Sequence, residues 1–251
     1  MSTCKIILNR KTIEAEKGET ILAVARKHGI AVPTLCHHEA LTPYGACRLC
    51  IVEVSTAGKT EIVSSCNTYV KEGMKITTHS ARIKKARRLI VELLLARSPN
   101  APVIQQLARD MGIAATPFSR SDDLCIMCGL CVRTCSEIVG AHAINFAHSG
   151  INKEVSVPFS RDSRECIGCG SCVFVCPTGA VRMIDTIGGE QDVSERFLDK
   201  WQTRLDLQEC AKDGNPFATK RMIEYFSQRF PVGKHFADMS PHCRHNSDET
   251  G

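Results

Sequence analysis

The sequence predicts an α+β protein with two small cysteine-rich modules, a helical linker between them and a mostly helical C-terminal tail. Twelve of the 15 cysteines fall into three groups of four, and the last two groups repeat one spacing 41 residues apart. A basic segment with helical periodicity separates the first group from the second. We therefore expect four regions: residues 1–78, 79–117, 118–187 and 188–251.

The composition is that of a globular protein, with 43% hydrophobic and 24% charged residues. The longest apolar stretch, residues 89–96, is eight residues long and is interrupted by Glu92, whereas a membrane helix needs about 20 apolar residues. Residues 1–10 contain no apolar signal core, which argues against secretion. Cysteines in an unsecreted chain are more often metal ligands than disulfides. These features predict a cytoplasmic metalloprotein.

The second and third cysteine groups share the pattern C-x2-C-x2-C-x3-C, and Pro177 follows the third. In bacterial two-cluster ferredoxins, three such thiolates bind one 4Fe-4S cluster and the fourth reaches the other cluster. The predicted ligand sets are Cys125, Cys128, Cys131 and Cys176 for one 4Fe-4S cluster, and Cys166, Cys169, Cys172 and Cys135 for the other. The identical repeat disfavours the alternatives, zinc or unligated thiols. This 4Fe-4S ferredoxin-like domain should span residues 118–187, with short strands at 143–146 and 180–184.

The first cysteine group has the pattern C-x10-C-x2-C-x15-C and consists of Cys36, Cys47, Cys50 and Cys66. Plant-type 2Fe-2S ferredoxins also combine a C-x2-C pair with a distant fourth cysteine, although their first gap is shorter. The flanking sequence predicts a hairpin (residues 5–8 and 12–15), a helix (21–28) capped by Thr20, and strands at 50–54 and 61–63. We interpret residues 1–78 as a β-grasp 2Fe-2S ferredoxin domain, with a zinc site as the alternative.

The order of these motifs resembles a known arrangement. Residues 34–36 read Thr-Leu-Cys, residues 45–50 read Gly-Ala-Cys-Arg-Leu-Cys, and a basic helix and two 4Fe-4S runs follow. The chain in this respect resembles the N-terminal part of the complex I G (75 kDa) subunit. It is also similar to the small diaphorase subunit of bidirectional hydrogenases and to the N-terminal extension of iron-only hydrogenases. The resemblance covers residues 4–185, about 70% of the chain.

One departure from that family concerns a further cluster. Family members usually carry a 4Fe-4S site with one His and three Cys ligands, in the pattern H-x3-C-x2-C-x5-C, after the basic helix. Residues 98–107 of this chain contain neither His nor Cys. That cluster is therefore predicted to be absent.

The resemblance implies a function in electron transfer. The expected partners are a flavin-containing, NAD(P)H-oxidising subunit and a terminal redox enzyme, such as a hydrogenase, formate dehydrogenase, transhydrogenase or other reductase. A flavin-based electron-bifurcating complex is one assembly of this kind. The sequence contains no G-x-G-x-x-G, G-x-x-x-x-G-K-[ST] or G-x-S-x-G motif, so no catalytic residue is predicted. We expect a non-catalytic subunit of a hetero-oligomer that binds no nucleic acid.

Three other functions compete with this interpretation. A free-standing multi-cluster ferredoxin-like carrier fits the same cysteines but not the basic segment or the aromatic tail. The iron-sulfur subunit of succinate dehydrogenase or fumarate reductase is disfavoured because both four-cysteine runs here are complete. A nucleic-acid-binding protein with structural clusters would need interleaved aromatics, which the basic segment lacks.

The sequence makes less specific predictions for two other regions. Residues 79–120 hold eight Lys or Arg and two acidic residues, which predicts either a solvated helix face or a docking face for an acidic partner. Residues 191–251 hold seven of the 13 aromatics and a predicted helix at 217–230, capped at Asn215 and Pro216. This tail packs on the chain itself or docks another subunit.

The tail also contains cysteines and histidines, namely Cys210, His235, His242, Cys243 and His245. Their spacing matches no zinc template, so whether they bind a further metal stays open. The remaining cysteine, Cys4, is interpreted as a buried small hydrophobic residue.

Overall fold

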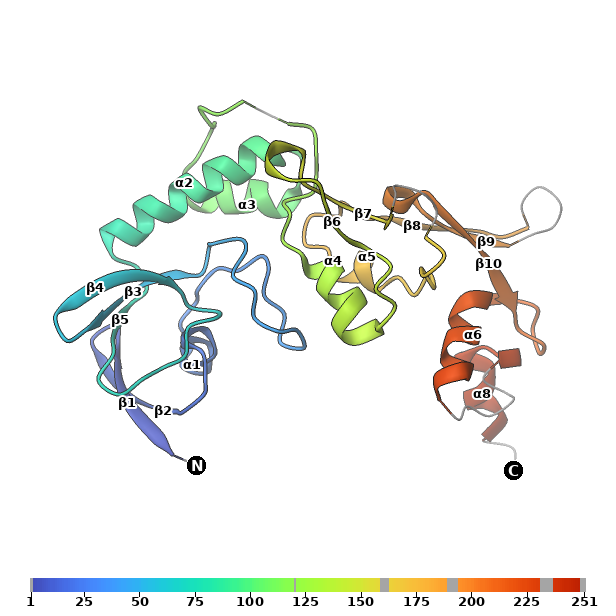
Figure 1. Ribbon diagram of the computed structural model, residues 1–251, viewed down its shortest axis with the longest axis horizontal. Coiled ribbons are helices and arrows are strands. Elements are labelled where there is room, and N and C mark those ends of the chain that lie inside the picture. Colours follow the sequence, from blue (N-terminus) through green and yellow to red (C-terminus); the bar gives the residue numbers. More distant parts are fainter. Residues whose placement is uncertain (1, 120, 159–162, 189–193, 231–236, 249–251) are drawn as a thin grey trace. The chain divides into compact units, whose positions relative to one another are not determined.

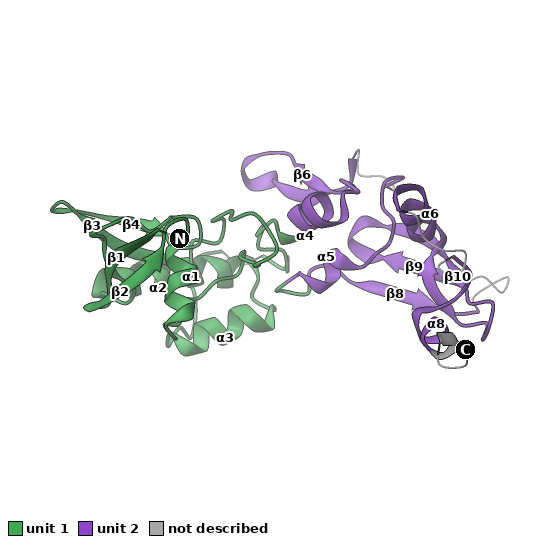
Figure 2. Ribbon diagram, turned by 90° about the horizontal axis from the view of Figure 1, so that it is seen from below, with its two compact units in different colours: residues 1–130, 177–179 green, residues 131–176, 180–251 purple. Residues whose placement is uncertain are grey.

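The computed structural model describes residues 2–119, 121–158, 163–188, 194–230 and 237–248 (Figure 1). The chain divides into two compact units, coloured separately in Figure 2. Unit 1 comprises residues 1–130 and 177–179, and unit 2 comprises residues 131–176 and 180–251. Among the described residues, no helix is both long and apolar enough to cross a bilayer.

Unit 1 is built on a five-stranded mixed sheet with the strand order β2-β1-β5-β3-β4. Strands β1 and β5 pair in parallel, and the other neighbours are antiparallel. The elements in chain order are β1 (Thr3–Leu8), β2 (Lys11–Glu16), α1 (Ile21–Lys27), β3 (Ile51–Thr56), β4 (Lys59–Ser64), β5 (Lys75–Thr77), α2 (Ala81–Arg97) and α3 (Pro102–Asp110).

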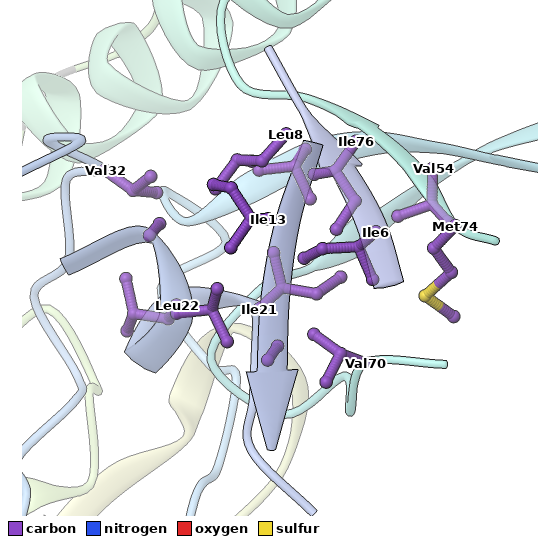
Figure 3. Close-up of a cluster of buried hydrophobic side chains, with 14 of the residues drawn as sticks. Ile6, Leu8, Ile13, Ile21, Leu22, Val32, Val54, Val70, Met74 and Ile76 are labelled. Atoms are coloured by element: carbon purple, nitrogen blue, oxygen red, sulfur yellow. The ribbon is translucent and has the colours of Figure 1, made fainter. Parts of the chain in front are cut away.

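The core of unit 1 lies between this sheet and α1 (Figure 3). Buried and exposed residues alternate along β1, so one face of the strand packs inward. Asn9 and Arg10 both adopt positive φ, which gives the tight β1–β2 turn its right-handed twist. Thr20 caps α1 by accepting the Ala23 N–H at 3.2 Å. The predicted hairpin, helix and strands of this domain are confirmed, with ends shifted by at most two residues.

The long helix α2 begins at Ser80, whose side chain accepts the Ile83 N–H at 3.2 Å. The buried side chains of α2 lie about one turn apart on one face of the helix. They include Ile83, Arg87 and Val91, whereas Leu93 is 48% exposed. Burial of Arg87 is unusual, because charged side chains are normally exposed to solvent.

Unit 2 contains a two-stranded sheet, β6-β7, and a four-stranded antiparallel sheet in the order β11-β10-β9-β8. Its elements are α4 (Leu130–Arg133), the π-helical turn η1 (Thr134–Val139), β6 (Asn145–Ala147), η2 (Gly150–Asn152), β7 (Glu154–Ser156), α5 (Ser171–Phe174), β8 (Met183–Thr186), β9 (Glu195–Leu198), η4 (Asp199–Trp201), β10 (Thr203–Glu209), β11 (Pro216–Thr219), α6 (Lys220–Arg229) and α8 (Pro241–Asp248).

The C-terminal tail differs from the mostly helical segment that the sequence predicts. Three of the four strands of the larger sheet, β9, β10 and β11, come from it. The helix expected at 217–230 starts later, at Lys220, because residues 216–219 continue the sheet. Its N-cap is Thr219, whose hydroxyl accepts the Met222 N–H at 3.1 Å, in place of Asn215.

Candidate iron-sulfur sites

The first cysteine group lies in unit 1, on the long loop that precedes β3 and on the segment that follows β4. Cys36, Cys50 and Cys66 are at most 1% exposed, and Cys47 is half-buried. The Leu35 N–H donates to Cys47 Sγ and the Cys47 N–H donates to Cys36 Sγ, each at 3.4 Å. Amide donors of this kind support thiolate ligands.

The four thiols of this group lie close enough to perturb one another. A hydrogen bond from the Cys66 thiol lowers the pKa of Cys50 to about 6, and the same bond raises the pKa of Cys66. A hydrogen bond with Cys36 likewise raises the pKa of Cys47. Metal binding to thiols requires the loss of their protons, so buried sulfurs that already share protons form a set of ligands suited to a metal. The structure therefore brings together all four residues predicted for the 2Fe-2S site.

Gly45 is required by the same loop. Its φ is +75°, and a Cβ added there would lie 2.8 Å from Nδ2 of Asn67, next to Cys66. The absence of a side chain at Gly45 thus lets the loop close against the segment that carries the fourth cysteine.

Arg87 connects α2 to this site. Its Nε donates to the Leu49 carbonyl at 2.9 Å, and one terminal nitrogen donates to the Ile51 carbonyl at 2.7 Å. Both acceptors flank Cys50, and the guanidinium charge interacts with the Cys50 sulfur. Burial lowers the pKa of Arg87, but an arginine stays charged at any physiological pH. A fixed positive charge is therefore built in beside the cysteine cluster.

We expect Arg87→Met to weaken unit 1 by about 2–4 kcal/mol, because two charge-assisted hydrogen bonds are lost and two carbonyls lose their donors. The readout is thermal unfolding of the full chain, followed by the visible circular dichroism of the 2Fe-2S centre. Arg88→Met is the matched control, since Arg88 is an exposed neighbour paired with Glu92 at 3.0 Å. Equal unfolding temperatures for the two variants would contradict the role assigned to Arg87.

The second site is assembled within unit 2 from both four-cysteine runs. Cys135 lines one small cavity together with Cys166, Cys169 and Cys172. Cys135 comes from the run 125–135, and the other three come from the run 166–176, so the structure brings together the four residues predicted as one crossed ligand set. The rest of the wall is mostly apolar or glycine, with Trp201 of the tail among its residues.

Backbone and indole N–H groups point at the sulfurs of this cavity. The Ala143 N–H donates to Cys135 Sγ at 3.3 Å, and the Trp201 indole N–H donates to Cys172. Burial raises the pKa of Cys166 to about 11 and that of Cys172 to about 12. At neutral pH these thiols are protonated without metal, so iron binding has to release protons.

The tail holds the loop that carries these cysteines. The Arg196 guanidinium donates to the Gly168 carbonyl at 2.8 Å and pairs with Asp185 at 2.7 Å. The Thr219 hydroxyl donates to the Ile167 carbonyl, and Arg221 donates to the Ser163 carbonyl at 3.0 Å. The described part of the tail therefore packs on the chain itself, which is one of the two roles considered for it above.

The other four cysteines of the two C-x2-C-x2-C-x3-C runs are divided between the units. Cys125 and Cys128 belong to unit 1, and Cys131 and Cys176 belong to unit 2. Within unit 1, the Cys125 N–H donates to Asp123 at 2.8 Å, and its carbonyl accepts from Arg97 at 2.7 Å. The grouping of these four residues around one cluster stays a prediction.

Three residues that support these sites were not singled out from the sequence: Arg87, Arg196 and Trp201. Each acts across more than 20 residues of sequence, so no local motif marks it. His235, considered above as a metal ligand, lies outside the described residues. Cys4 is 2% exposed in the core of unit 1, as expected.

Comparison with known protein families supports both cysteine-rich modules. Residues 2–81 match the model of a 2Fe-2S iron-sulfur cluster binding domain, and residues 124–180 match that of a 4Fe-4S dicluster domain. The predicted cluster types are thereby confirmed, as is their order along the chain.

Several curated proteins are similar to this chain. It is 31% identical over 204 residues to the G 2 subunit of NADH-quinone oxidoreductase from Rhizobium meliloti (strain 1021), covering 70% of this chain and 24% of that protein. It is 34% identical over 170 residues to the alpha subunit of NADPH-Fe(3+) oxidoreductase from Geobacter sulfurreducens (58% of this chain, 20% of the relative). It is 32% identical over 213 residues to the HndD subunit of the NADP-reducing hydrogenase from Solidesulfovibrio fructosivorans (72% and 36%).

A solved structure of an NAD+-reducing [NiFe]-hydrogenase in the H2-reduced state is also similar, with a TM-score of 0.56 and 26% identity. The match covers 62% of this chain and 75% of that one. This chain spans only about a fifth to a third of the length of the curated relatives above. The proteins that it resembles are thus subunits of NADH- or NADPH-linked oxidoreductases and an NAD+- or NADP-reducing hydrogenase, in agreement with the resemblance inferred from the motif order.

Proposed function

We propose that this chain is an electron-transfer subunit that connects a flavin-containing, NAD(P)H-oxidising partner with a terminal redox enzyme. The observation that carries the proposal is the gathering of cysteines into separate buried sets, each supported by amide donors and, in unit 1, by Arg87. Iron-sulfur clusters exchange single electrons at potentials that the surrounding protein tunes. The names of the relatives, which are subunits of NADH- or NADPH-linked enzymes and hydrogenases, support a hetero-oligomer with such partners. The flavin in the partner and a location in the cytoplasm are further parts of the proposal.

The ligand assignment is part of the proposal. Cys36, Cys47, Cys50 and Cys66 would hold one 2Fe-2S cluster, and the crossed sets headed by Cys125 and Cys166 would hold two 4Fe-4S clusters. In the first site, and in the cavity of Cys135, Cys166, Cys169 and Cys172, the chain supplies four sulfurs and N–H donors to them. The wall of that cavity is mostly apolar, which limits access of water. Assembly into an electron-bifurcating complex is one form of this function.

The basic face of α2 offers a route for partner docking. Arg82, Lys84 and Lys85 are exposed on this helix, and clustered positive charge speeds association with an acidic surface. Arg87 does not contribute to this face because it is buried.

The test is anaerobic purification of the tagged full chain from its own host, with iron analysis, EPR and identification of co-purifying subunits. We expect about ten irons per chain, distributed over one 2Fe-2S and two 4Fe-4S signals. NADH or NADPH should reduce these signals in the complex with the flavoprotein and leave the isolated chain oxidised.

Other results would point elsewhere. Material that runs only as a monomer, with every cluster reducible by dithionite, would favour a free ferredoxin-like carrier. Zinc in place of iron, or clusters that dithionite cannot reduce, would overturn electron transfer altogether.

A further inference from the structure

A third group of sulfur ligands lies in the tail, outside the sets discussed so far. It forms where the turn between β10 and β11 meets the start of α8. Cys210 Sγ, a carboxylate oxygen of Asp213 and Cys243 Sγ all lie within 4.8 Å of one another. Cys210 is 2% and Cys243 is 5% exposed, whereas Asp213 reaches the surface.

The turn presents two of these groups side by side. The Gly214 N–H donates to the Cys210 carbonyl at 2.8 Å, and the Cys210 N–H donates to the Asn215 carbonyl at 3.0 Å. Gly214 has φ +72°, which lets the chain reverse directly after Asp213. One carboxylate oxygen, Asp213 Oδ1, accepts the Asn215 N–H at 3.1 Å. The other, Oδ2, lies 3.2 Å from Cys243 Sγ and is directed at the thiols.

The third group is positioned by the first turn of α8. The Cys243 N–H donates to Ser240 Oγ at 3.3 Å, and the Ser240 N–H donates to Cys210 Sγ at 3.4 Å. The Ala211 N–H donates to the Asp238 carbonyl at 2.7 Å. A backbone donor directed at a buried sulfur is the support that metal-bound thiolates use.

The spacing and the donor atoms both indicate zinc. Cys210 and Asp213 are separated by two residues, as are the paired ligands of the C-x2-C turns in zinc sites. Zn–S bonds of about 2.3 Å and a Zn–O bond of about 2.0 Å, at tetrahedral angles, place ligand atoms about 3.5–3.8 Å apart. That separation lies within the 4.8 Å limit observed for the three atoms. Thiolate and carboxylate ligands in one tetrahedral set suit zinc, whereas magnesium and calcium prefer oxygen only.

We propose that Cys210, Asp213 and Cys243 bind one zinc ion, with a water molecule as the fourth ligand. Binding releases the two thiol protons to solvent and joins the β10–β11 turn to α8. The ion has no redox role, and the site stands independently of the electron-transfer function proposed above. Its position on the tail would stabilise the same segment that holds the Cys166–Cys172 loop.

The test uses the full chain with its clusters, purified anaerobically, exposed to zinc salt and then washed with a chelator. We expect about one zinc per chain by mass spectrometry, and X-ray absorption at the zinc edge should give two sulfurs at about 2.3 Å and oxygen ligands at about 2.0 Å. The double variant Cys210→Ser/Cys243→Ser should lose the zinc and keep its iron. Cys4→Ser, an equally buried cysteine in β1, is the matched control and should keep both metals.

A more conservative variant tests the proposal even if the double variant misfolds. Asp213→Asn keeps an oxygen for the Asn215 N–H and removes the ligand charge, so zinc should be lost to the chelator at least 10-fold faster. The proposal is overturned by a chain without zinc, by zinc that survives both sets of substitutions, or by four sulfurs around the zinc, which would place it in a cluster site. A Cys210–Cys243 disulfide in the anaerobic protein, found by peptide mass mapping, would overturn it equally.

Discussion

Replacing Cys135 with serine is expected to remove the cluster held by residues 166–172 and to spare the cluster of its own run. The reason is geometric, because Cys135 shares a cavity with Cys166, Cys169 and Cys172. Loss of one thiolate from a 4Fe-4S site should lower the iron content from about ten to about six per chain. The measurement is iron analysis with EPR of the dithionite-reduced protein.

Two further variants identify which cluster is lost. Cys169→Ser removes a ligand from within the run 166–172, and Cys128→Ser removes one from within the run 125–131. We expect the EPR spectrum of Cys135→Ser to match that of Cys169→Ser. The reciprocal variant, Cys176→Ser, should match Cys128→Ser. A Cys135→Ser spectrum that coincides with that of Cys128→Ser would rule out the crossed arrangement.

Removing the tail is expected to have an effect of similar size. A chain that ends at Thr186 lacks Trp201, Arg196 and Thr219, whose side chains contact the 166–172 loop or its cysteines. It also lacks the sheet partner of β8. We expect this chain to lose the cluster at Cys166–Cys172 and to keep the 2Fe-2S signal. Full iron content in the truncated chain would show that the cluster does not depend on these contacts with the tail.

A single substitution tests the same contact without removing chain. Gly168 has φ +66°, and a Cβ there would lie 2.6 Å from Leu205 Cδ1 and 2.7 Å from Thr219 Cγ2. Gly168→Ala should cost about 1–2 kcal/mol for the left-handed backbone and about 1–3 kcal/mol more for overpacking. Gly150→Ala is the control, because Gly150 has a similar φ of +59° and open space around it. The difference between the two unfolding free energies isolates the contact between loop and tail.

How far the sequence predicted this molecule depended on whether the signal was local. The Thr20 cap and the positive-φ backbone turn at Asn9 and Arg10 are local features, so the first helix and hairpin were predicted nearly to the residue. The spacing of the cysteines, which is also a local signal, predicted the cluster types and their order along the chain. Arg87 was counted with a basic segment expected to face solvent or an acidic partner. The carbonyls that bind it inside unit 1 lie 36 and 38 residues earlier, so no local pattern marked it.

The tail was harder to predict for a related reason. Strands β9 and β11 have only four residues each, and the sheet that they form with β10 also includes β8, which precedes the tail. The aromatic residues there suggested helix packing, but Trp201 lies buried in a short turn beside the cysteine cavity. Asp213 was overlooked because one carboxylate on a turn has no meaning until Cys243 folds back beside it.

The contacts between the 166–172 loop and the tail also set an order of events during synthesis. A ribosome completes residues 1–78, with all four cysteines of the first site, well before Thr219 emerges. The cavity around Cys135 and Cys172 lacks its Trp201 wall and its Arg196 and Thr219 donors until about 50 more residues have been added after the loop. Since domains fold from the N-terminus as they emerge, the N-terminal site is ready for its metal while the later site is still open. The N-terminal site can therefore acquire its metal before the walls of the later site are complete.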